Sequence, residues 1–302
     1  MGLFKPAYET DNPNKKDKAI ASLSKVTSDQ ELAVIYKKAP LDEVADAALA
    51  RIKSQQVLRD LLCHYRWRDR KDFPKILARI DDVSLLKDIV QEGKGKKWID
   101  MDYWVRDTIP VAFEKLPEPD IEEVEIYFKA ILNEDKCIEW IEHLEYPEDR
   151  ELLCGIMNLR LVNTFNEAAA KKIPASEEPE LVKEILRTGP DGAAIVFVDC
   201  LKMPEDKDLL MDMLQRGDKI RIKAAEILAQ DETMRDYSFC PYCGRPASSI
   251  SYGYRGLFND MFYYGWSCPC GHTNSVPEGY GEPDSFAVTI AEFAEDPDRY
   301  KK

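Results

Sequence analysis

The segment IKSQQVLRDLL, residues 52–62, begins with an apolar residue and a short polar turn, and it continues as an amphipathic helix. Four other segments share this layout: VTSDQELAVIY (26–36), IDDVSLLKDIV (80–90), IPASEEPELVKEIL (173–186) and MPEDKDLLMDML (203–214). Val26, Ile52 and Ile80, the first residues of three of them, are 26 and 28 residues apart. A unit of this length holds two short helices, which bury their apolar sides only against neighbouring units. The spacing therefore predicts a helical solenoid.

A second helix with small residues on one side precedes most of these segments, as in DEVADAALARI (42–52) and DKIRIKAAEIL (218–228). In LRTGPDG (186–192) and LQRGD (214–218), a glycine follows an arginine in the last turn, which is typical of helix C-termini. Residues 117–170 fit the period poorly, and we predict irregular helices there.

The helices with small residues resemble the short HEAT-like repeats of bacterial proteins, a class named after the phycobilisome lyases, whose hallmark is D-x-x-V-R-x-x-A-x-x-A-L. The matching positions are Asp42, Val44, Ala47, Ala48, Leu49, Val105, Arg106, Ile220, Arg221, Ala224, Ala225 and Leu228. The resemblance covers about two thirds of the chain. It implies a HEAT-like α-solenoid in a bacterial protein of unknown function. Such repeats occur in enzymes, in lyases that act like chaperones and in scaffolds, so they imply no activity.

The composition changes after Met234, where about 50 residues are rich in glycine, serine, tyrosine and proline. A module this small seldom folds without a metal or disulfides. Cys240 and Cys243 lie in CPYCG (240–244), a sequence typical of a zinc knuckle, and Cys268 and Cys270 form a second pair. We predict a zinc ribbon with a hairpin made by SSISYGYRG (248–256) and MFYYGWSC (261–268), in which all four cysteines bind Zn²⁺.

His272 is an alternative ligand that would replace one cysteine at the metal. Four cysteine ligands fill the coordination shell of zinc, and the sequence holds no H-E-x-x-H motif, so we expect a structural ion and no catalytic residues. Cys-Pro-Tyr-Cys is also the active-site sequence of glutaredoxins, where it opens a helix. Here a stretch with strand character follows it, which argues against redox catalysis.

Two stretches combine basic and aromatic residues in an otherwise acidic chain: HYRWRDRK (64–71) and KGKKW (94–98). About one repeat separates them, so we expect them to lie on one edge of the solenoid as a basic ridge that binds an anion. The alternative is that these cations lie near helix C-termini and that the tryptophans are core residues. The basic ridge comprises Arg66, Trp67, Arg68, Arg70, Lys71, Lys94, Lys96, Lys97 and Trp98.

The charge balance limits the classes of partner. With 42 Lys and Arg against 56 Asp and Glu, the net charge is -14, which disfavours nucleic acids and anionic membranes. Neither a signal peptide nor an apolar run of membrane-spanning length is present, so we expect a cytoplasmic protein. We expect an N-terminal extension (1–17), a repeat domain (18–235), a zinc ribbon (236–284) and a C-terminal tail (285–302).

Three functional hypotheses follow from these features. The first is a non-enzymatic scaffold that binds a protein partner of unknown identity and carries a structural zinc site. The second is a nucleic-acid-binding protein that uses the basic ridge, although the net charge disfavours it. The third, implied by the resemblance, is an enzyme or a cofactor chaperone like the HEAT-like lyases.

Overall fold

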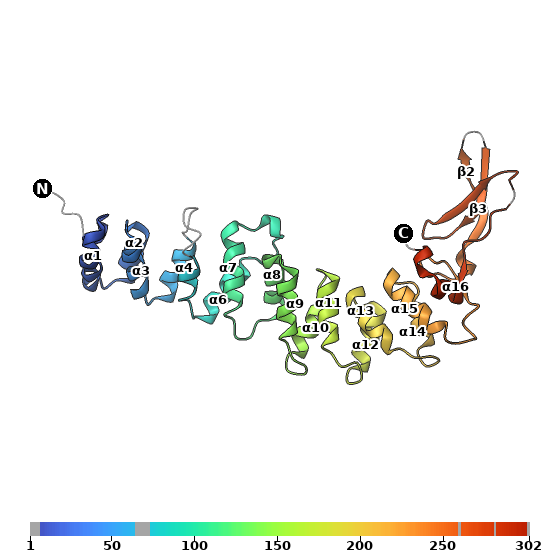
Figure 1. Cartoon of the computed structure of the whole chain (residues 1–302), viewed down its shortest axis with the longest axis horizontal. Helices are drawn as coiled ribbons and strands as arrows, with labels where there is room; N and C mark the ends of the chain where they lie inside the picture. Colours follow the sequence, from blue (N-terminus) through green and yellow to red (C-terminus); the bar gives the residue numbers. More distant parts are fainter. Residues whose placement is uncertain (1–6, 64–72, 259–260, 281, 301–302) are drawn as a thin grey trace. The chain divides into compact units, whose positions relative to one another are not determined.

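The chain forms two compact units, residues 1–134 and residues 135–302. The computed structural model describes residues 7–63, 73–258, 261–280 and 282–300. These residues contain 16 α-helices, and two small antiparallel sheets lie near the C-terminus (Figure 1). The prediction of a mainly α chain with a small β-rich C-terminal module is confirmed. Within the described ranges, each helix is too short or too polar to cross a lipid bilayer.

Short helices make up the described part of the first unit. Helices two apart in sequence contact each other, as α2, α4, α6 and α8 do in turn, and sequential neighbours such as α2 and α3 also pack together. The bounds are α1 (Lys16–Ser22), α2 (Asp29–Lys38), α3 (Asp42–Arg51), α4 (Gln55–Cys63), α5 (Phe73–Leu77), α6 (Val83–Gln91), α7 (Tyr103–Phe113) and α8 (Ile121–Ile131).

The second unit has the same pattern of contacts. Helix α11 packs against α13 and α13 against α15, while α12 packs against α13 and α14. Residues 117–170, which fit the sequence period poorly, are helical as predicted, and the boundary between the two units lies among them. The bounds are α9 (Glu134–Glu142), α10 (Arg150–Asn158), α11 (Asn163–Lys171), α12 (Pro179–Thr188), α13 (Asp191–Phe197), α14 (Lys207–Met213), α15 (Asp218–Leu228) and α16 (Ile290–Glu295).

Polar side chains fix where several helices begin. The Asp82 carboxylate accepts hydrogen bonds from the first backbone N–H groups of α6. Asp120 and Glu123 form a reciprocal capping box at the start of α8. Such caps provide partners for N–H groups that have none within the helix.

Small residues allow the closest helix contacts. Gly192 is buried in α13, and a Cβ atom added there would lie 2.1 Å from the backbone oxygen of Asn163 at the start of α11. Ala193 and Ala194 beside it are also buried. Helices α11 and α13 therefore approach at a distance that a larger side chain at position 192 would prevent.

Arginine and lysine side chains link helical pairs in the first unit. The pairs are α2 with α3, α4 with α5, and α6 with α7, and in each case a cation at or just after the second helix bonds to backbone carbonyls of the preceding turn of the chain. Arg51 donates from Nη2 to the Val26 carbonyl at 3.1 Å. Arg79 donates to the carbonyls of Leu49 and Ile52 at the end of α3, each at 2.7 Å. Lys115 makes the same kind of contact with the carbonyls of Leu77, Ala78 and Ile80. Carbonyls at helix ends have no partner within their own helix, so the following pair completes the preceding one.

Arg216 provides this link in the second unit. Its guanidinium donates to the carbonyls of Ile185 (3.1 Å), Leu186 (2.7 Å) and Gly189 at the end of α12. As predicted from the sequence, Arg187 lies in the last turn of α12 and Gly189 directly follows that helix. The same prediction for residues 214–218 is wrong, because α14 ends at Met213 and Arg216 lies beyond its last turn. In the structure Arg187 is exposed, and the arginine that binds these carbonyls comes from the next helical pair.

The C-terminal module holds two sheets. Strand β1 (Ser238–Phe239) pairs antiparallel with β5 (Val288–Thr289). Strands β2 (Ser251–Phe258), β3 (Met261–Ser267) and β4 (Thr273–Pro277) form an antiparallel sheet in chain order. The predicted hairpin corresponds to β2 and β3. Residues 285–302, expected from sequence to be a tail, include β5 and α16, and α16 packs on α15.

We predict that Arg216→Ala lowers the free energy of unfolding by about 2 kcal/mol, because it removes the donor to the Leu186 and Gly189 carbonyls, a second donor to the Ile185 carbonyl and the ion pair with Asp191. Arg187→Ala is the matched control, since this exposed side chain should change stability by less than about 0.5 kcal/mol. Urea unfolding followed by circular dichroism measures both. Equal effects of the two variants would contradict the proposed link.

Candidate metal centre

Four cysteine side chains meet in the C-terminal module. The sulfur atoms of Cys240, Cys243, Cys268 and Cys270 all lie within 4.8 Å of one another. The Sγ atoms of Cys240 and Cys270 are 3.9 Å apart, and those of Cys243 and Cys268 are 3.5 Å apart. Four thiolates placed tetrahedrally about 2.3 Å from a metal lie roughly 3.8 Å from one another. A disulfide needs about 2.0 Å, and these cysteines are free. The donor set and its spacing fit a tetrahedral metal ion.

Two tight turns hold the cysteine pairs. In the first turn, the backbone N–H groups of Cys243 and Gly244 donate to the carbonyl of Cys240 at 3.3 and 2.8 Å. In the second, the N–H of Gly271 donates to the carbonyl of Cys268 at 2.9 Å. Gly244 has a φ of 70°, a conformation that side chains other than that of glycine disfavour. Each turn brings its two sulfurs to one side.

The surroundings of the sulfurs are largely apolar. Cys240 and Cys268 are buried with Ile250, and Trp266 and Phe286 pack against this cluster. Such an environment limits the access of water to the sulfurs and restricts the orientations of the cysteine side chains.

Burial raises the pKa of the Cys240 thiol well above its ordinary value, and burial also raises the pKa of Cys268. Burial acts in the same direction on Cys270, but the backbone N–H of His272 and the neighbouring thiols outweigh it and lower its pKa to about 7. Metal binding requires thiolates, so it would release protons from this cluster.

His272 lies beside the cysteine cluster without belonging to the group of ligand atoms within 4.8 Å of one another. Its ring stacks on that of Tyr242, with ring centres 3.7 Å apart, and meets the ring of Phe286 edge-on at 4.7 Å. This geometry favours the four-cysteine set over the set that includes His272.

The first cysteine turn is fitted against the end of α14. A Cβ atom added to Gly244 would lie 1.8 Å from the Leu214 carbonyl oxygen, so only glycine allows this approach. Arg221 in α15 is 5% exposed, and it donates both to the Leu214 carbonyl (2.7 Å) and to the Pro241 carbonyl (3.2 Å). One buried guanidinium therefore connects two helices to the first cysteine turn.

The structure describes only part of the basic ridge. Residues 64–72, which include Arg66, Trp67, Arg68, Arg70 and Lys71, lie outside the described residues, as does the side chain of Trp98. Lys94 forms an exposed ion pair with Glu122 at 2.8 Å, which offsets its positive charge. Lys97 is exposed and Lys96 is half-buried. This geometry gives the nucleic-acid hypothesis no added support.

The exposed apolar residues of the C-terminal sheet were not singled out from the sequence. Large apolar residues on β2 and β3 are exposed, including Tyr254 (54%), Leu257 (55%) and Phe262 (47%). The alternation of aromatic residues at positions 252 and 254, and again at 262, 264 and 266, could have indicated a sheet side covered with rings. The sequence does not show whether such a side is buried or exposed.

Comparison with known proteins identifies no relative of this chain, because no family model, no curated protein and no solved structure matches it. The resemblance to HEAT-like repeats therefore stays a prediction.

We predict that Gly244→Ala separates the cysteine turn from α14 and lowers both metal affinity and stability, because the added methyl group overlaps the Leu214 carbonyl. Gly271→Ala is the control for conformational strain alone: its φ is 91°, but no atom lies within 4 Å of an added Cβ. Gly271→Ala should cost about 1–2 kcal/mol and Gly244→Ala distinctly more. Thermal unfolding with metal analysis measures both, and equal losses would exclude a specific role for the contact with Leu214.

Proposed function

We propose that the C-terminal module binds one Zn²⁺ ion through Cys240, Cys243, Cys268 and Cys270, and that this ion is structural. The observation that carries the proposal is the cluster of four sulfurs within 4.8 Å. Thiolate ligands in a tetrahedral arrangement suit zinc, and four protein ligands leave no position for a substrate or for an activated water. Binding of the ion supplies folding free energy to a module with a small core.

The helical region, on this proposal, is a HEAT-like α-solenoid. The proposal is supported by arginine side chains that donate to backbone carbonyls about one repeat earlier in the chain. Arg51 and Val26 are 25 residues apart, Arg79 and Ile52 are 27 apart, and Arg216 and Gly189 are 27 apart. These separations of 25 to 27 residues are close to the spacing of 26 and 28 residues between Val26, Ile52 and Ile80. The ribbon then serves as the cap of the last repeat, because Gly244 and Arg221 hold it against α14 and α15.

We propose that the whole chain is a non-enzymatic scaffold that binds a protein partner in the cytoplasm. Closed metal coordination and the approach of the metal-binding turn to the helices both favour a structural role for the ion over catalysis. The net charge of -14 favours a protein partner over nucleic acid.

The metal site is tested by elemental analysis of the purified protein. We expect one zinc per chain, and Cys243→Ser should lose the zinc and unfold the C-terminal module, because three ligands hold the ion poorly. Far-ultraviolet circular dichroism should retain most of its helical signal. Cys200→Ser is the control, because Cys200 is an exposed cysteine outside the cluster. A folded Cys243→Ser protein with an intact module and no zinc would contradict a structural role, and iron in the wild type would contradict the choice of metal.

The scaffold role is tested by binding measurements on the purified, zinc-loaded chain. A partner recovered by affinity purification and then produced separately should bind at a fixed stoichiometry in calorimetry. Short duplex DNA and single-stranded RNA should not bind even at low salt. Nucleic-acid binding that weakens steeply with salt would instead support a role for the basic ridge.

A further inference from the structure

One side of the C-terminal sheet carries a row of aromatic rings. Tyr252 pairs with Trp266 and Tyr254 pairs with Tyr264 across β2 and β3, and directly opposed residues lie on the same side of a sheet. The ring centres are 5.2 Å apart in the first pair and 5.8 Å in the second. Beyond a bulge, Leu257 pairs with Phe262. We name this side the aromatic face, formed by Tyr252, Tyr254, Leu257, Phe262, Tyr264 and Trp266.

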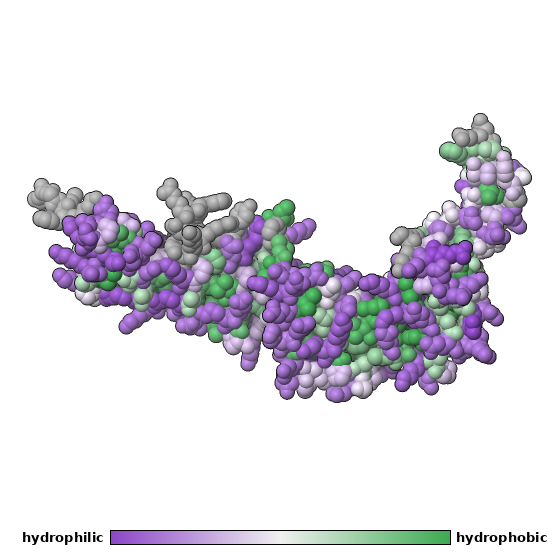
Figure 2. Space-filling model, viewed as in Figure 1, coloured by the Kyte–Doolittle hydropathy of each residue, from purple (hydrophilic) through white to green (hydrophobic). Residues whose placement is uncertain are grey.

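Much of the aromatic face is exposed to solvent. Tyr254, Leu257 and Phe262 are each about half exposed. Figure 2 shows deep purple charged residues over much of the helical surface, whereas the sheet is pale, with green apolar residues near its tip. Single exposed apolar residues are ordinary, but a contiguous group of them marks an interaction site.

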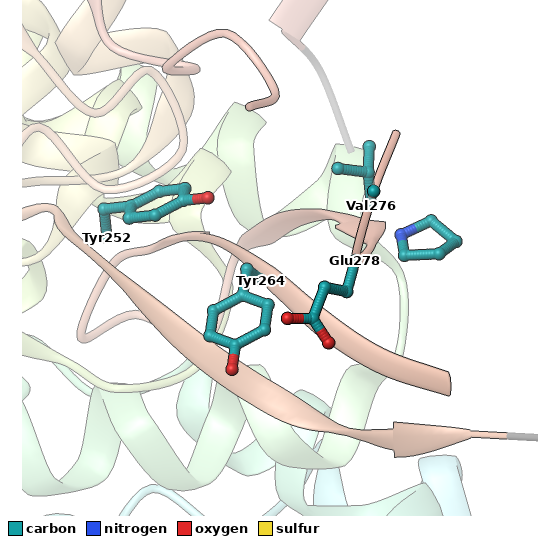
Figure 3. A pocket seen from close by; sticks show the side chains of 6 residues that line it. Tyr252, Tyr264, Val276 and Glu278 are labelled. Atoms are coloured by element: carbon teal, nitrogen blue, oxygen red, sulfur yellow. The ribbon is translucent and has the colours of Figure 1, made fainter. Parts of the chain in front are cut away.

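A hollow of about 420 Å³ lies at one end of the aromatic face. Tyr252, Tyr264, Val276, Pro277 and Glu278 line it together with a glycine. The carboxylate of Glu278 points toward the ring of Tyr264 (Figure 3). The lining therefore combines two tyrosine rings, two apolar side chains and one negative charge.

The Glu278 carboxylate supplies the negative charge of this hollow. Within the described part of the chain, Glu278 makes no ion pair and its carboxylate accepts no hydrogen bond. Arg255 is the one Lys or Arg between residues 251 and 284, and its guanidinium donates to the carbonyls of Gly265 and Ser251. Four carboxylates in this stretch, Asp260, Glu278, Glu282 and Asp284, give it a net charge of 1 − 4 = −3.

We propose that the hollow binds a lysine or arginine side chain of a partner protein, and that apolar residues beside this cation cover the aromatic face. Tyrosine rings attract a cation over their faces, and the Glu278 carboxylate adds a charge of the complementary sign. Valine and proline contact the aliphatic stem of such a side chain. This inference rests on the scaffold function proposed above and specifies the chemistry of its partner.

Two other occupants fit the charges less well. Single-stranded nucleic acid also stacks on exposed rings, but it needs a positive groove for its phosphates, and this sheet is negative. A second copy of the chain carries a net charge of -14, so the two copies would repel each other. A basic segment of a different protein satisfies both the rings and the carboxylate.

The test begins with random dodecapeptides displayed on phage and selected on the full-length, zinc-loaded protein. Counter-selection uses the Tyr252→Leu/Tyr264→Leu variant, which keeps apolar volume but removes the rings. Enriched peptides should carry a lysine or arginine at a fixed position. Fluorescence anisotropy of the best synthetic peptide then gives Kd for each protein. We expect a loss of about tenfold for Tyr264→Leu and about fivefold for Glu278→Gln, with weaker binding in 500 mM than in 50 mM NaCl.

Glu282→Gln is the matched control, because it removes an exposed carboxylate that does not line the hollow. It should leave Kd unchanged, and replacing the peptide cation with glutamine should weaken binding as much as Glu278→Gln does. Enriched peptides without a cation, a failure to enrich any peptide, or equal effects of Glu278→Gln and Glu282→Gln would each overturn the proposal. So would binding of a uridine dodecanucleotide, or self-association that Tyr264→Leu abolishes. Zinc content measured on every variant separates these outcomes from failure of the structural metal site.

Discussion

Unpaired carbonyl groups at the ends of short helices are the constraint on which the helical region depends. A helix leaves its last carbonyls without partners, and a chain of short helices has many such ends. Here a cation from the following helical pair donates to carbonyls at these ends: Arg79 donates to that of Ile52 at the end of α3, and Arg216 donates to that of Leu186 at the end of α12. Each pair is therefore completed by the next. The same dependence explains why the contacts recur at about the period of the sequence, since a residue can serve the preceding pair only from an equivalent position in its own.

The last pair has no following pair, and the cysteine turn takes that place. Arg221 still binds the carbonyl of Leu214 within the helical region, but it also binds the carbonyl of Pro241 in the turn. Gly244 leaves room for the backbone of the turn to lie against Leu214. Helix α16 then packs on α15, and the β1–β5 ladder connects α16 to the residues just before Cys240. A metal ion at the four sulfurs would fix this arrangement, because both cysteine turns belong to one coordination shell.

Anchoring at one end also explains how the remaining sheet can present apolar residues to solvent. The second cysteine turn directly follows β3, and the ring of Trp266 packs on the cysteine cluster. The base of the hairpin therefore belongs to the core around the cysteines, and the rings farther along β2 and β3 are not needed for it. A surface that does not contribute to the core is available to bind a partner. On our proposal, the negative charge of Glu278 makes this surface prefer a positively charged partner.

The sequence by itself determined the mainly helical class, the β-rich C-terminal module, its hairpin and the four cysteines that come together. It could do so because apolar periodicity and cysteine spacing are local properties of the chain. The pairing of β1 with β5, the role of Arg216 at α12, the approach of Gly244 to Leu214 and the exposure of the aromatic face were decided only by the tertiary structure. Each of these depends on which distant backbone segment lies opposite a given residue. An arginine precedes a glycine near a helix end both in residues 186–189 and in residues 214–217, yet of these two arginines it is Arg216 that donates to the Leu186 and Gly189 carbonyls. Alternating tyrosines indicate a sheet side rich in aromatic rings. Whether that side is buried depends on which other segments cover it, and the sequence of a single strand does not specify those segments.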